Sequence, residues 1–321
     1  MSWPECSLAE VAYGSQERGR AVRDRFGAMT ELVIDPVRRG RTRLADGRSL
    51  AWAEWGPEDG APMLFCPGAG TSCSLGLGDE VARLGVRLVA VDRPGLGESD
   101  PDPGRTLLSF AEDVRALGEV RGMERPRVLA FSQGAPFALA CAAAGVASAV
   151  AIVSGSDELA APEIAAQLVP DVRGMVARVA EDPEGAEAFF RGMTAAMMRE
   201  MVLAMIGPSD RAIYLEPTFD AAYRRALDEG FAQGAHGYAR DTVLAMGAWP
   251  FELGRISVPV ELWYGSEDTS PVHSPDLGAS LARRIPDARR TVLAGGGAIL
   301  WTHATTILES LLRARGQDPG S

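Results

Sequence analysis

Short continuous apolar runs alternate with helix-forming stretches along most of the chain. The runs occupy residues 62–66, 86–91, 128–130, 149–153, 258–264 and 290–293. Runs of this length without polar alternation are typical of strands buried on both faces of a sheet. The intervening segments carry helical patterns, which include residues 107–120, residues 277–284 and a final helix that ends near Arg313. This alternation predicts an α/β fold with a mostly parallel, doubly wound sheet.

Two other regions precede the alternating pattern. Residues 1–30 are polar and predict an N-terminal helical arm. The segments 32–34 and 50–55 are apolar, and the turn formers Asp46 and Gly47 lie between them. They predict a pair of hairpin strands at the edge of the sheet.

Residues 157–247 contain several amphipathic helical patterns and no convincing strand. An all-helical insertion of this size between strands predicts a cap over the open end of the sheet. The core then comprises residues 31–156 and 248–315. Within the cap, Met193, Met197, Met201 and Met205 recur at every fourth residue. Such a stripe either packs one helix against its neighbour or forms a deformable apolar pocket wall.

The composition excludes several classes of function. The 321 residues are 46% hydrophobic and 23% charged, with a formal net charge of -11, which disfavours nucleic acid and anionic membrane surfaces as partners. The sequence contains no lysine, so a P-loop lysine and a lysine Schiff base are excluded. The scattered histidines and cysteines show no metal-ligand spacing, and no cofactor is expected.

The cysteines and the hydropathy pattern indicate a cytoplasmic protein. The four cysteines form no C-x-x-C pair, and Cys66 and Cys141 lie in apolar runs, which favours free thiols in a reducing compartment. No apolar stretch has the length of a membrane span, and the pattern of a secretory leader is absent. A homodimer is left open.

One serine has the setting of a nucleophile. Ser132 lies in Ala-Phe-Ser-Gln-Gly, directly after the strand predicted at 128–130 and before a helix-forming stretch. A small-x-Ser-x-Gly turn between strand and helix raises the serine hydroxyl above the end of a sheet. Such a serine needs a base and an oxyanion site. The backbone amide of Gln133 supplies one donor, and Ala69 or Gly70 in the glycine loop after residue 66 could supply a second.

The ordered set of motifs resembles the α/β-hydrolase superfamily, in the group of small-molecule hydrolases with a helical cap. The similar segments are the glycine loop Pro-Gly-Ala-Gly at 67–70, Asp-Arg-Pro-Gly-Leu-Gly-Glu-Ser at 92–99, the Ser132 turn, and the stretch from Trp249 to Asp268. The resemblance covers about residues 40–313. It implies that Ser132 is the nucleophile and that Asp268 is the acid that orients a histidine. Asp157, at the end of the preceding strand, is an alternative acid.

The sequence departs from the family pattern at the histidine. In the family this residue follows the last strand in a glycine-rich turn, and here Ala298 occupies that position. An alanine cannot transfer a proton. His303 is expected to be a packed or surface residue of the final helix, His273 a solvated loop residue, and His236 at most a substrate contact in the cap.

Two interpretations follow from this departure. Either the chain is an inactivated form of a serine hydrolase that acts on an ester, lactone or thioester of an apolar small molecule, or it binds a metabolite or performs cyclase or carbon–carbon chemistry on the same fold. Retention of Ser132, Asp268 and the glycine loop favours the first. The candidates for substrate contact are Met197, Met201, Phe131 and Trp249.

Overall fold

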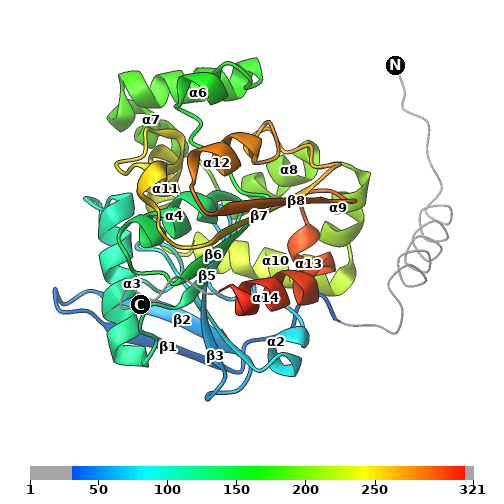
Figure 1. Cartoon of the computed structure of the whole chain (residues 1–321). Helices are drawn as coiled ribbons and strands as arrows, with labels where there is room; N and C mark the ends of the chain where they lie inside the picture. The colour runs from blue at the N-terminus through cyan, green and yellow to red at the C-terminus, as the bar shows by residue number, and fades with distance from the viewer. Residues whose placement is uncertain (1–30, 315–321) are drawn as a thin grey trace, which may run out of the picture.

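The computed structural model describes residues 31–314, so the predicted N-terminal arm lies outside the described residues. These residues form an eight-stranded sheet with the order β1-β2-β4-β3-β5-β6-β7-β8 (Figure 1). The strands are β1 (Arg38–Arg43), β2 (Ser49–Trp55), β3 (Ala61–Cys66), β4 (Val86–Val91), β5 (Arg127–Phe131), β6 (Ala149–Val153), β7 (Val260–Gly265) and β8 (Ala288–Leu293). Strands β3 to β8 run parallel to one another. Strand β2 is antiparallel to β4, and β1 is antiparallel to β2. The predicted α/β-hydrolase fold class is confirmed.

Helices cover both faces of the sheet. The core helices are α2 (Glu80–Arg83), α3 (Leu107–Arg121), α4 (Ala135–Ala143), α12 (Ala279–Arg284), α13 (Ile299–Thr302) and α14 (Ala304–Arg313). Helices α3, α4 and α12 pack on one face, and α2 and α14 pack on the other. Alternate residues of each strand therefore enter two separate cores: Val128 and Ala130 face α4, while Leu129 and Phe131 face the opposite side.

The first strand differs from the sequence prediction. Residues 32–34 form no strand, and the partner of β2 is β1, which has the sequence Arg-Arg-Gly-Arg-Thr-Arg. This strand lies at the edge of the sheet, where charged side chains remain in water and discourage pairing with another chain. An edge strand of this kind lacks the apolar run by which the other strands were recognised.

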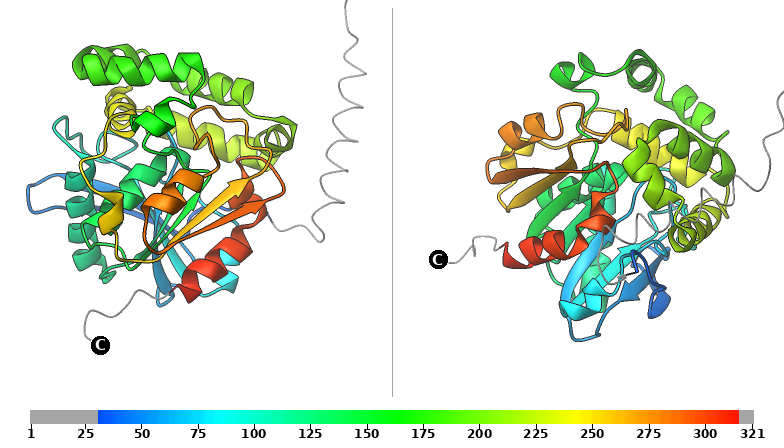
Figure 2. Two further views of the ribbon diagram at one scale, coloured as in Figure 1. Left: turned by 45° about the horizontal axis from the view of Figure 1, so that its top comes forward. Right: turned by 90° about the vertical axis from the view of Figure 1, so that its right-hand side faces the viewer.

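The stretch between β6 and β7 is helical. Its helices are α5 (Pro162–Ala165), α6 (Pro170–Glu181), α7 (Pro183–Phe190), α8 (Ala195–Met205), α9 (Pro208–Tyr214), α10 (Pro217–Gly230) and α11 (His236–Met246). Figure 2 shows most of these helices gathered above one end of the sheet, away from α14. We refer to α5–α11 as the helical insertion. Within residues 31–314, no helix combines the length and hydropathy needed to cross a bilayer.

Candidate active site

Ser132 stands on a strained turn at the carboxyl end of β5. Its φ of 51° lies in the left-handed region, which non-glycine residues rarely adopt. The turn Ser132–Gly134 leads directly into α4. A Cβ at Gly134 would lie 2.2 Å from the carbonyl oxygen of Cys66, so only glycine allows β3 and the turn to approach this closely. The geometry is that of the nucleophile turn expected from the sequence.

His273 connects Ser132 to Asp268. Its Nε2 atom lies 2.9 Å from Ser132 Oγ, and its Nδ1 atom lies 2.7 Å from Asp268 Oδ2. Nucleophile, imidazole and carboxylate therefore form one continuous chain of hydrogen bonds, the arrangement in which a histidine can accept the serine proton.

The expectation that His273 is a solvated loop residue is wrong. Its side chain is only 10% exposed. The loss of a base was inferred from the alanine at position 298, but the structure brings an imidazole to Ser132 from the loop after β7. The expected chain order of serine, acid and histidine is kept, and the histidine follows the acid by five residues. The sequence did contain a signal for this role, because His273 follows the acid and lies closer to Asp268 in the chain than His236 or His303 does.

Ser274 anchors the histidine loop to the end of β6. Its amide donates to the carbonyl oxygen of Gly155 at 2.9 Å, and its hydroxyl donates to Asp157 Oδ2 at 3.4 Å. Asp157 is fully buried, and this burial raises its pKa to about 6. Asp157, proposed from the sequence as an alternative acid, thus holds the residue beside His273, whereas Asp268 contacts the imidazole itself.

Asp268 remains ionised despite its burial. Burial alone would raise its pKa, but the neighbouring His273 imidazole and its hydrogen bond, together with the Ser270 amide, outweigh this effect and lower the pKa below its usual value. The Ser270 amide donates to Asp268 Oδ1 at 3.0 Å. The carboxylate can therefore fix the orientation of the imidazole and stabilise its protonated form.

Arg93 holds the glycine loop that faces Ser132. Its guanidinium donates to the carbonyl oxygen of Pro67 at 2.7 Å and to that of Gly68 at 3.0 Å. Its Nε atom donates to Asp241 at 2.6 Å, and both side chains are buried. Both carbonyls therefore point toward Arg93. The backbone N–H that follows the Gly68 carbonyl belongs to Ala69, which lines the same cavity as Ser132.

The other expected oxyanion residues lie in different surroundings. Gln133 is the second residue of the turn at Ser132, where backbone amides have no partner within a helix. Gly70 has a φ of 65°, and a Cβ there would lie 2.6 Å from the Phe231 ring of the helical insertion. Gly70 thus makes the sharp bend in the loop, while Ala69 is the residue that lines the cavity.

A small apolar cavity of about 90 Å³ lies beside Ser132. Helix α8 contributes three of its methionines, and aromatic side chains close the remaining sides. The lining includes Met198, Met201, Met205, Phe65, Phe131, Tyr214, Tyr223 and Trp301. The methionine stripe divides between the two interpretations, since Met201 and Met205 line the cavity whereas Met193 packs against the core.

Two of the expected substrate contacts lie elsewhere. Met197 is 50% exposed and is not among the residues that line the cavity, because it points away from it on α8. Trp249 is buried on the opposite face of the sheet, where it stacks on Phe251. Met201 and Phe131 do line the cavity. Periodicity identified the helix but not which methionines face inward, since this depends on how α8 docks.

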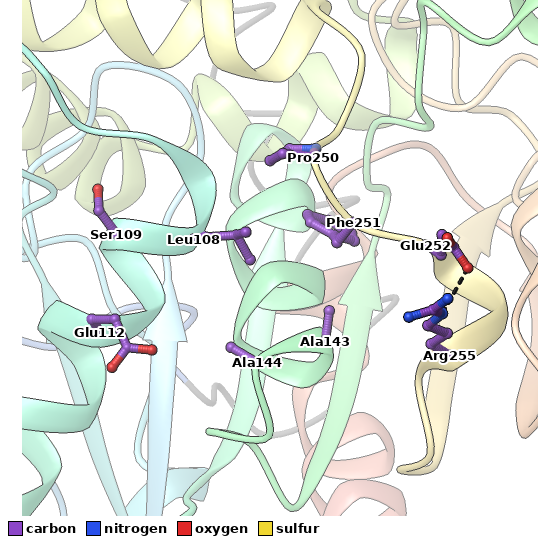
Figure 3. Close-up of a pocket in the computed structure, with 9 residues that line it drawn as sticks. All are labelled: Leu108, Ser109, Glu112, Ala143, Ala144, Pro250, Phe251, Glu252 and Arg255. Atoms are coloured by element: carbon purple, nitrogen blue, oxygen red, sulfur yellow. Dashed lines mark ion pairs between the residues drawn. The ribbon is translucent and has the colours of Figure 1, made fainter.

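Phe251 lines a second hollow, which is separate from the Ser132 cavity. Its lining comes from α3, the end of α4 and the segment 250–255 (Figure 3). Glu252 and Arg255 form an ion pair of 2.7 Å at its rim. Neither Ser132 nor His273 belongs to this hollow, and we assign it no chemistry.

The turn that carries Ala298 is occupied by an acid from the helical insertion. Asp210 of α9 accepts hydrogen bonds from the amides of Gly297 at 2.7 Å and Ala298 at 2.8 Å. No sequence motif marks Asp210, because its role depends entirely on how α9 packs on the core. The other two histidines take no part in the site: His303 contacts Thr302, and His236 is exposed at the start of α11.

These residues could perform acyl transfer, and the described part of the chain contains no cluster of three or more potential metal ligands. A model of the alpha/beta hydrolase family matches residues 63–309. The chain belongs to the alpha/beta hydrolase family. Ser132, Asp268 and His273 all lie within the matched region.

One curated protein and several solved structures are similar to this chain. A non-heme chloroperoxidase from Streptomyces lividans is 26% identical over 241 residues, which cover 71% of this chain and 82% of the relative. Among solved structures, an esterase from Rhodococcus sp. has a TM-score of 0.62 at 19% identity and covers 87% of this chain and 99% of its own. An enol-lactonase from Burkholderia xenovorans has a TM-score of 0.60 at 20% identity, with coverages of 85% and 99%. At these identities the solved structures establish the alpha/beta hydrolase fold alone.

Proposed function

We propose that this protein is an active serine hydrolase that cleaves carboxylic esters, including lactones and thioesters, of small acyl groups. The observation that carries the proposal is the position of His273 within hydrogen-bonding distance of both Ser132 and Asp268. This arrangement supplies the base whose absence would have inactivated the chain. A protein that only binds a metabolite has no need of such an assembled proton path, so the binding alternative is disfavoured.

The reaction follows from the geometry. His273 Nε2 takes the proton as Ser132 Oγ attacks the carbonyl carbon, and Asp268 stabilises the imidazolium that forms. The amides of Gln133 and Ala69 bind the negatively charged oxygen of the tetrahedral intermediate. The imidazolium then gives its proton to the departing alcohol or thiol. Water, deprotonated by the same imidazole, releases the acid from Ser132.

The cavity limits the acyl group. Its volume of about 90 Å³ suits a short chain, and thioether and aromatic side chains form most of its walls, with the Asp210 carboxylate among them. The leaving group must extend out of this cavity. We therefore propose short-chain esters as substrates.

The cysteines support a reducing compartment for this enzyme. Within the described residues, Cys66, Cys73 and Cys141 are free and buried. Burial raises the pKa of Cys66 to about 12, which leaves the thiol protonated and unreactive. These observations favour the cytoplasm as its location.

The test is covalent labelling combined with turnover. We expect a fluorophosphonate probe to label the unaltered chain on Ser132 and the chain to hydrolyse phenyl butyrate. Ser132→Ala should lose both. Ser148→Ala, a control at the opposite end of β6, should retain both. Absence of labelling and turnover in the unaltered, folded protein would overturn the proposal.

A further inference from the structure

Asp210 brings a second carboxylate into the Ser132 cavity. It lines the cavity together with Asp268 and His273, and its side chain is almost completely buried. Its two oxygen atoms each accept one backbone amide, from Gly297 and Ala298. A carboxylate oxygen can accept a further hydrogen bond beyond one amide. Asp210 is thus held in place, and its oxygen atoms can still accept further hydrogen bonds.

The turn is shaped around this carboxylate. A Cβ at Gly296 would lie 2.3 Å from Asp210 Oδ1, and one at Gly297 would lie 3.0 Å from Asp268 Oδ1. Side chains at either position would displace the acids. The two glycines therefore leave room for both carboxylates beside the turn.

Little positive charge offsets these acids. Among the residues of the described range 31–314 that line the cavity, His273 is the only one able to carry a positive charge, and it already contacts Asp268. Burial, together with the Asp268 carboxylate, raises the pKa of Asp210 above its usual value, and the amides of Ala298 and Gly297 oppose this effect by stabilising the anion without neutralising it. An anionic acyl group brought into this cavity would be repelled and would lose its hydration without gaining a partner of opposite charge.

The aromatic walls act in the same direction. Tyr214 and Tyr223 line the cavity with ring centroids 5.0 Å apart, and Trp301 lies beside them. The faces of aromatic rings carry partial negative charge and attract cations. Carboxylate and rings together form a lining suited to an ammonium group or another hydrogen-bond donor.

We propose that Asp210 makes the acyl pocket selective for acyl groups that carry a positive charge or a hydrogen-bond donor, and that it excludes anionic acyl groups. This inference rests on the proposed hydrolase function. Asp210 is a specificity-determining residue of that reaction and takes no part in the proton transfer between Ser132 and His273.

The test compares three phenyl esters of similar acyl size. The acyl groups are butyrate, which is neutral, β-alanine, which carries an ammonium group, and malonate, which carries a carboxylate. Each kcat/KM is divided by the rate constant for hydroxide hydrolysis of the same ester. We expect β-alanine to exceed malonate at least tenfold in the unaltered protein. A ratio of one or less would overturn the inference without any variant.

The residue is tested with Asp210→Asn. We expect the ratio of β-alanine to malonate to fall at least fivefold, chiefly through the KM values. Asp171→Asn, which removes the same charge from an exposed position on α6, should leave the ratio unchanged. An unchanged ratio in Asp210→Asn, or an equal fall in Asp171→Asn, would show that Asp210 does not set the selectivity.

The two proposals fail in different ways. If phenyl butyrate is not hydrolysed and Ser132 is not labelled, the hydrolase function fails. If phenyl butyrate is hydrolysed and the charged esters do not differ, only the inference about Asp210 fails.

Discussion

The Nδ1 atom of His273 lies 2.7 Å from Oδ2 of Asp268, a residue only five positions earlier in the same loop. In the family pattern described above, the histidine instead follows the last strand. Moving the imidazole into the loop of the acid leaves its distance to Ser132 Oγ at 2.9 Å. An imidazole can thus reach the serine and the acid from a different position in the chain than the family pattern predicts.

His273 is the residue whose removal should abolish turnover. In a serine protease, loss of the histidine costs roughly a millionfold in kcat, and we expect His273→Ala to lower ester hydrolysis by at least about ten-thousandfold. His303→Ala, which removes a histidine away from the cavity, should retain activity. Initial rates with phenyl butyrate measure both. Comparable losses in the two variants would contradict the assignment.

A histidine introduced at position 298 should bring no gain in ester hydrolysis. Ala298 is buried and lines the small Ser132 cavity, so a histidine side chain there would fill much of that space and crowd the residues around it. We expect Ala298→His to destabilise the protein by about 1–3 kcal/mol, the usual cost of overpacking. Denaturant unfolding and ester hydrolysis measure the two effects. An increase in turnover with this variant would show that His273 is not the operating base.

Replacement of Arg93 should weaken catalysis from a distance. Arg93→Lys keeps the charge near Asp241 but cannot donate simultaneously to the Pro67 and Gly68 carbonyls and to Asp241 in the same planar geometry. The Ala69 amide then loses its alignment, and we expect kcat to fall on the order of tenfold to a hundredfold. Arg41→Lys, at an exposed ion pair with Asp100, is the matched control. A change confined to KM would argue against an oxyanion role for this loop.

Asp157 should make stability depend on pH in the opposite direction to an acid whose pKa is lowered on folding, because its burial outweighs its ion pair with Arg284 at 3.6 Å. Burial raises its folded-state pKa from 3.8 to about 6, so the folded protein binds the proton more tightly than the unfolded chain does. Its favourable contribution is complete below about pH 4 and is lost as the pH rises through about 6. Relative to Asp157→Asn, the unaltered protein should therefore lose on the order of 2 kcal/mol between these limits. Urea unfolding of both proteins at intervals across this range measures the difference, and parallel pH profiles would contradict it.

The sequence predicted the central sheet well because its strands are buried on both faces. Residues 86–91 and 149–153 were assigned with the observed bounds, since continuous apolar runs mark such strands clearly. The edge strand β1 was missed because its arginines face solvent. Ser132 was recognised from its local turn, which is a property of consecutive residues.

The roles of His273 and Asp210 were missed for a different reason. His273 reaches Ser132 only because Ser274 ties the loop to Gly155. Asp210 reaches the turn at Ala298 only because α9 docks on the core. Both depend on contacts between segments far apart in the chain, for which a single sequence offers no periodic signal. The family pattern directed attention to position 298 instead.

The short separation of Asp268 and His273 has a consequence for assembly of the site. Contacts between residues close in sequence lose little chain entropy when they form, so this pair can come together as soon as its loop is ordered. Docking of β8, α13 and α14 is not required to bring the acid and the imidazole to each other. Local opening of the C-terminal segment would therefore release the turn held by Asp210 and the hydrogen bonds of residues 266 and 267 to that segment, while Asp268 and His273 would remain neighbours in the chain.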